Sequence, residues 1–119
     1  MAAFYTMEID QGADASFCFC FEDEVGALSF PDHTAAMQIR RSAFSNDVID
    51  SLTTDNGRLV MDCEGGKITV LFPCAITENY PSCLAHFDIE VEGPSGTITR
   101  LLDGKIQINA GVTHARCSK

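Results

Sequence analysis

The sequence is poor in the residues that carbohydrate-binding and nucleic-acid-binding proteins use. It contains no tryptophan and only two tyrosines, so aromatic platforms on which sugars could stack are scarce. Its 8 Lys and Arg residues stand among 17 Asp and Glu residues, which gives a net charge of −9. Phosphate binding requires clustered basic side chains, and we therefore expect no direct contact with nucleic acid.

The chain also lacks long apolar runs and a signal-like N-terminus. No uninterrupted apolar stretch approaches the roughly 20 residues that span a bilayer, so we expect no membrane segment. The first residues have neither a basic start nor a following apolar stretch, which argues against a secretory signal. We expect synthesis in a cytoplasm, where most of the six cysteines would stay reduced.

The dominant pattern that is present is the alternation of apolar and polar residues that indicates β-strands. Residues 84–92 alternate Phe87, Ile89 and Val91 with polar side chains, as in an antiparallel strand with one solvated face. Further strands are expected at 4–10, 16–24, 35–41, 58–62, 66–72, 97–102 and 105–109. In the last two segments, the apolar residues before and after Gly104 keep the same alternation and so fall on one face. This favours a single strand with a glycine kink or bulge.

Turn residues separate these segments at regular intervals, at 56–57, 65–66 and 93–96. Helical signals are confined to 46–52 and 75–80, each compatible with one or two turns. We predict an all-β fold, an antiparallel, immunoglobulin-like β-sandwich of about 7–9 strands with at most one or two short helical turns. The sandwich is expected to cover residues 1–113, followed by a C-terminal tail at 114–119.

Three short motifs, taken in order, resemble a known family. They are Met-Gln-Ile-Arg at 37–40, Phe-Asp-Ile-Glu at 87–90 and Arg-Leu-Leu-Asp-Gly at 100–104. With the aromatic strand at 17–21, this order resembles small structural proteins of tailed phages and prophages that have an immunoglobulin-like sandwich. The layout is similar to the N-terminal domain of upper-baseplate and fibre-attachment proteins. One departure is Ser-Cys-Leu at 82–84, where relatives often have glycine.

The resemblance implies a non-catalytic virion protein that acts by oligomerisation and docking. Its expected position is the tail baseplate, the neck or the fibre-attachment region, with other virion proteins as partners. The alternative from the same class is a capsid cement or decoration protein, because a small acidic sandwich would serve there equally well. A binding module for sugar or another small ligand is the alternative from a different class.

Cys18 and Cys20 are candidate interface residues. They alternate with Phe17, Phe19 and Phe21, so this strand is apolar on both faces. The phenylalanines are expected in the core. A soluble monomer rarely exposes an apolar strip, and we predict that the cysteine face is covered by the second sheet or by a neighbouring subunit.

Four further residues are candidates for interfaces. Arg100 stands between Ile98 and Leu102 on an otherwise apolar face. It either forms an interface contact or buried ion pair with an acid such as Glu90 or Asp103, or extends to the sheet edge. The remaining candidates are Arg40 and two residues of the tail, His114 and Arg116, where the tail is either frayed or a docking arm.

The sequence does not support a metal or catalytic site. Structural zinc ligands usually come as two close pairs, whereas Cys18 and Cys20 are separated by one residue and have no second pair. Cys83 and His86 lie three residues apart, which places them on opposite faces of a strand. We predict no catalytic residues, no metal and no cofactor.

Overall fold

The computed structural model describes residues 3–23, 26–27, 29–42 and 46–112. The protein is nearly all-β, with eight strands in two sheets and one short helical turn. A further pair of two-residue strands forms a small ribbon. The elements in chain order are β1 (Ala3–Asp10), β2 (Ala15–Cys20), β3 (Glu22–Asp23), β4 (Gly26–Ala27), β5 (Thr34–Arg40), β6 (Val48–Thr53), β7 (Leu59–Asp62), β8 (Lys67–Phe72), α1 (Cys74–Thr77), β9 (Cys83–Glu92) and β10 (Ile98–Asn109).

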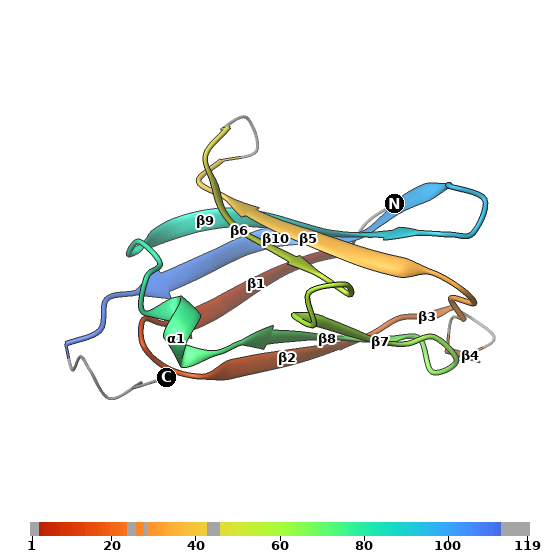
Figure 1. The fold of residues 1–119 in the computed structure, drawn as a ribbon, viewed down its shortest axis with the longest axis horizontal. Helices are drawn as coiled ribbons and strands as arrows, with labels where there is room; N and C mark the ends of the chain where they lie inside the picture. Colours follow the sequence, from red (N-terminus) through yellow and green to blue (C-terminus); the bar gives the residue numbers. More distant parts are fainter. Residues whose placement is uncertain (1–2, 24–25, 28, 43–45, 113–119) are drawn as a thin grey trace.

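The two sheets are stacked as layers, and α1 lies at one end of the sandwich (Figure 1). The larger sheet has the order β1-β10-β9-β5-β6, and the smaller sheet has the order β2-β8-β7. The prediction of a purely antiparallel sandwich is wrong at one position, because β1 pairs with β10 in parallel. Since β2 crosses to the other sheet, β1 has no hairpin partner and lies beside the last strand of the chain.

The core lies between the layers and is formed by the inward-facing residue of each alternating pair. Met37, Ile39, Ile89 and Ile106 of the five-stranded sheet are fully buried there. They meet inward-facing side chains of β8, which are also fully buried, namely Ile68, Val70 and Phe72. The phenylalanines of β2 are partly buried and pack against this core, as expected. Burial of about 25 cal/mol per Å² of apolar surface makes this contact the main stabilisation of the fold.

All three predicted turns, at 56–57, 65–66 and 93–96, lie between strands as expected. The loop at 93–96 closes a hairpin between β9 and β10, in which the Gly93 amide donates to the Thr97 carbonyl at 3.0 Å. Gly57 and Gly66 have positive φ angles, 79° and 65°, which glycine adopts without steric cost. The helical turn expected within 75–80 is observed as α1, which begins after Pro73.

The other predicted helical segment, at 46–52, is wrong. Residues Val48–Thr53 form strand β6, the edge of the five-stranded sheet, and pair with β5. The apolar spacing that suggested a helix is short, and two of its members, Val48 and Ile49, are β-branched residues that favour strands. Pairing with β5 therefore determines the conformation.

Residues 98–109 form one strand, as predicted, but the irregularity does not lie at Gly104. The register between β9 and β10 shifts between Arg100 and Leu102, so the bulge is at Leu101. Gly104 itself pairs regularly with Phe87. Glycine is needed at this position for space and not for a bulge, because a Cβ atom there would lie 1.7 Å from the carbonyl oxygen of Tyr5. The close approach of β1 requires glycine at this position.

Candidate functional site

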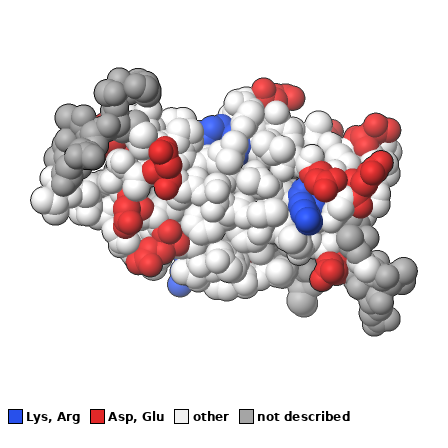
Figure 2. Space-filling model, turned by 90° about the horizontal axis from the view of Figure 1, so that it is seen from below, with Lys and Arg blue, Asp and Glu red and all other residues white. Residues whose placement is uncertain are grey.

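The outer face of the three-stranded sheet is largely uncharged. Cross-strand rows on this face place Cys18 beside Thr69 and Val60, and Cys20 beside Lys67 and Asp62. Figure 2 views the molecule from the side of this sheet and shows a broad uncharged area with acidic residues around it. We call this surface, formed by Cys18, Cys20, Val60, Thr69 and Leu71, the uncharged face.

Cys18 and Cys20 are exposed free thiols on the uncharged face. The expectation that the second sheet covers them is wrong, because that sheet packs on the opposite side of β2, against the phenylalanines. Val60 is also 52% exposed. Exposed apolar side chains that share one flat face are typical of protein–protein contacts. Coverage by a neighbouring subunit thus remains the prediction for these two cysteines.

The other cysteines of the described part of the chain differ in environment. Cys63 and Cys83 are free and half-buried, and Cys74 is disulfide-bonded. Cys83 packs against the core. The side chain of His86, three residues later, lines a groove on the outer face of the five-stranded sheet. The expectation that these two side chains point to opposite faces is confirmed.

That groove, about 560 Å³ in volume, lies over β5, β9 and β10 and contains both predicted arginines, Arg40 and Arg100. Arg40 donates from Nε and Nη2 to the side-chain oxygen of Gln38, at 3.2 and 2.7 Å. Phe4, which is 64% exposed, lines the same groove. The sheet face therefore combines charged, polar and aromatic groups.

Arg100 forms ion pairs across the β9–β10 hairpin. Its guanidinium lies 3.5 Å from the carboxylate of Asp88 and 4.0 Å from that of Glu90. Of the two alternatives left open by the sequence, the structure shows an ion pair with Glu90, one of the acids named, but the pair is not buried, because the Arg100 side chain is 53% exposed. The bulge at Leu101 changes the face on which Arg100 lies relative to Leu102, which removes it from the apolar side. Exposed pairs of this kind contribute little to stability.

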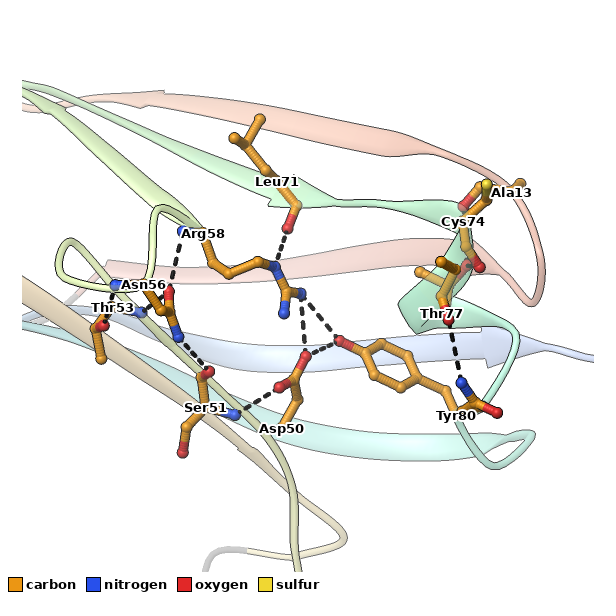
Figure 3. Close-up of polar contacts among 12 residues, drawn as sticks. Ala13, Asp50, Ser51, Thr53, Asn56, Arg58, Leu71, Cys74, Thr77 and Tyr80 are labelled. Carbon is orange, nitrogen blue, oxygen red and sulfur yellow. Dashed lines mark hydrogen bonds and ion pairs between the residues drawn. The ribbon is translucent and has the colours of Figure 1, made fainter. Parts of the chain in front are cut away.

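The sequence did not reveal a buried polar network that joins the two sheets (Figure 3). Arg58, which precedes β7, lies 3.0 Å from the carboxylate of Asp50 on β6. Its Nε donates to the Leu71 carbonyl at 2.9 Å, and the Tyr80 hydroxyl donates to Asp50. Burial raises the pKa of Tyr80, and the hydrogen bond to Asp50 acts in the same direction. This network fixes the edge at which β6 and β7 meet.

A second set of polar contacts fixes the turn between β1 and β2 to α1. The buried hydroxyl of Thr77 donates to the Ala13 carbonyl at 3.0 Å and accepts from the Gly12 amide at 3.1 Å. The Asp14 carboxylate accepts from the amide of Cys74 at 2.6 Å. All of these groups have partners, so the contacts are structural. The residues that form them are 60 or more positions apart in the sequence, and no local motif predicts such pairing.

Within the described ranges, no three His, Cys, Asp or Glu side chains are grouped closely enough to hold a metal ion. None of the helices in those ranges is long and apolar enough to cross a membrane. His114 and Arg116, predicted as interface residues of the tail, lie outside the described residues.

Comparison with known proteins adds no relative. The chain matches no protein-family model, and a search of curated proteins found no significant match. The resemblance to phage structural proteins rests on the residue pattern alone.

Proposed function

We propose that this protein is a non-catalytic structural subunit of a tailed-phage particle, docked to a neighbouring virion protein through the uncharged face. The resemblance of the motifs at 37–40, 87–90 and 100–104 supports membership of the virion class and an immunoglobulin-like sandwich. The two-sheet fold is compatible with that class. Within the particle, the resemblance favours the tail baseplate, the neck or the fibre-attachment region.

The observation that carries the proposal is the exposure of Cys18, Cys20 and Val60 on one flat sheet face. Burying this face against a partner removes apolar surface from water. It desolvates few charges, because the charged residues Lys67 and Asp62 lie side by side in the last row of the face. The partner surface should be similarly uncharged at its centre. Repetition around a symmetric particle allows a modest contact of this kind to hold many copies.

The position in the particle is tested by the copy number of the protein relative to the major capsid protein, measured by quantitative mass spectrometry of purified particles. A small multiple of the portal copy number is expected for a neck, baseplate or fibre-attachment protein. Abundance comparable to the capsid protein would instead identify a cement or decoration protein. Absence from the particle would contradict the proposal as a whole.

The docking face is tested by a matched pair of substitutions. Val60→Asp places a charge in the centre of the uncharged face and is expected to abolish incorporation into particles. Ile98→Asp places the same charge at the first residue of β10, beside the hairpin loop and at an isoleucine that is 61% exposed, and is expected to leave incorporation unchanged. Equal incorporation of both variants would contradict docking through the uncharged face.

A sugar-binding module is a second candidate, favoured by one observation. Phe4 is 64% exposed beside Gln38, Asp88 and Glu90 in the groove, so an aromatic ring and polar groups share one recess. A saturable thermal shift with glycans, abolished by Phe4→Ala, would support this function. The docking function predicts no such shift.

A further inference from the structure

The outer face of the five-stranded sheet carries charge in bands that cross the strands. One row places Lys105, His86 and Arg40 side by side on β10, β9 and β5. The next row, two residues along each strand, places Asp103, Asp88 and Gln38 side by side. We call these the basic row and the acidic row. Because the side chains of alternate residues share a face, both rows point away from the core.

The acidic row is unfavourable within one molecule. Like charges directly opposite each other on neighbouring strands destabilise a sheet, and this row places Asp103 directly opposite Asp88. The side chains of Lys105 and Asp103 form no ion pair in the part of the chain that the structure describes. His86 likewise has no hydrogen-bond partner there. In a protein with 17 acidic residues, neighbouring opposite charges would be easy to supply. Asp88 has such a partner in Arg100, but Lys105 and Asp103 have none among the described residues, which suggests that the partner charges of these two residues come from outside.

We propose that this face binds a second copy of the chain in a two-fold, face-to-face stack. The two-fold axis lies in the interface, parallel to the rows and midway between them. Rotation about this axis keeps each strand above its own counterpart and exchanges the two rows. Lys105 then faces Asp103 of the second copy, and His86 faces Asp88 of the second copy. Every such contact occurs twice, so the surface is complementary to itself.

The neighbours of the two rows fit the same arrangement. Phe4 lies in the acidic row, beside Asp103, and Thr6 lies in the basic row, beside Lys105. The stack therefore covers the exposed Phe4 ring with the polar but uncharged Thr6 of the second copy. Arg40, at the other side of the sheet, faces Gln38 of the second copy. No pair of like charges is brought together in these two rows.

The contact is expected to be weak and sensitive to salt. Five strands about 4.8 Å apart, overlapping over six residues, give a flat area of about 400 Å² per copy. Stable dimers usually bury about 800 Å² per partner. Exposed ion pairs are also screened, with a Debye length of about 10 Å at 0.1 M salt. The stack therefore suits copies that are held close together in an assembly. It lies on the opposite side of the sandwich from the uncharged face and is independent of it.

Charge reversal tests the pairing of Lys105 with Asp103 directly. Lys105→Glu alone and Asp103→Lys alone each create two repulsive contacts in the stack. We expect either variant to raise the dimer dissociation constant at least about tenfold. A mixture of the two variants restores both opposite-charge contacts in a heterodimer. The double variant Lys105→Glu, Asp103→Lys restores them in a homodimer, with the charges exchanged.

The measurement is sedimentation equilibrium of the isolated full chain at low salt, up to about 1 mM protein. Lys67→Glu, which reverses an exposed lysine on the opposite face, is the control and should leave the dissociation constant unchanged. Recovery of dimers by the mixture and by the double variant supports the stack. A purely monomeric wild-type chain would overturn it, as would single variants that dimerise normally or a failure of both rescues. None of these outcomes depends on incorporation into particles.

Discussion

The guanidinium of Arg58 lies 3.0 Å from the carboxylate of Asp50, and this ion pair joins the two sheets of the sandwich. Only 11% of the Arg58 side chain and 17% of the Asp50 side chain are exposed to solvent. The pair is supported by Tyr80, whose hydroxyl lies 3.3 Å from Arg58 and donates to Asp50. The strands β6 and β7 are edge strands of the two different sheets, so the network fixes one side of the sandwich.

Removal of Arg58 should destabilise the protein strongly. Arg58→Met leaves the Asp50 carboxylate buried without its counter-charge, and we expect a loss of about 3 kcal/mol in the free energy of unfolding. Arg100→Met is the matched control, because it removes an exposed arginine that pairs with Asp88 and Glu90. That control should cost less than about 1 kcal/mol. Urea denaturation measures both values, and equal losses would contradict the structural role of Arg58.

Gly104→Ala should be more disruptive than alanine at an ordinary strand position. The added Cβ would lie 1.7 Å from the Tyr5 carbonyl oxygen, so β1 must move away from β10. We expect a loss of about 3 kcal/mol or more in the free energy of unfolding. Gly93→Ala serves as the control, because its Cβ would meet only the His33 side chain, at 3.1 Å. Thermal unfolding of the two variants compares them, and a stable Gly104→Ala protein would contradict the close approach of β1.

The stability of the protein should fall in alkaline solution because of Tyr80. Burial raises the pKa of Tyr80 above its ordinary value of 10.0, so the folded state keeps the phenolic proton that the unfolded chain loses. The unfolded state binds fewer protons above pH 10, and the free energy of unfolding therefore falls as pH rises. The slope contributed by one group is at most about 1.4 kcal/mol per pH unit.

Comparison with Tyr80→Phe isolates this contribution, because lysine side chains titrate in the same range in both proteins. Below pH 10 the wild type should be the more stable protein, and its advantage should shrink as pH rises further. Urea denaturation at several alkaline pH values measures the difference. A difference that stays constant with pH would show that Tyr80 does not keep its proton in the folded state.

The free thiols should differ in reactivity in the isolated protein. Cys18 and Cys20 are exposed, whereas Cys63 and Cys83 are half-buried. We expect iodoacetamide to modify Cys18 and Cys20 first, since alkylation requires access to the sulfur. Peptide mass spectrometry at successive times gives the order. Faster modification of Cys83 than of Cys18 would contradict the placement of Cys83 against the core.

Much of the fold could be predicted from residue alternation. The strand at 84–92 was evident because buried Phe87, Ile89 and Val91 alternate with solvated acids along one antiparallel strand. The parallel position of β1 could not be predicted in this way, because β1 pairs with a strand about 100 residues later and alternation carries no information on partners. Strand β6 was missed for a related reason: its conformation depends on pairing with β5.

The candidate surfaces were predicted less completely. The sequence identified Cys18 and Cys20 as residues on the reverse of the phenylalanine stripe, and the structure places them on an exposed face. It also suggested Glu90 or Asp103 as a partner of Arg100, and the structure shows the pair with Glu90. The network of Asp50, Arg58 and Tyr80 was not predicted, because contacts between sheets depend on how the layers are superposed. The basic and acidic rows likewise emerge only once the strand register is known.

The most direct test of docking through the uncharged face is differential alkylation of Cys18 and Cys20 in purified particles and in the isolated protein. The two thiols should react readily in the isolated protein and be protected in intact particles. Protection should disappear when the particles are dissociated. Rapid modification of both cysteines in intact particles would contradict the account, because the face proposed to be covered by a neighbouring virion protein would then be open to solvent.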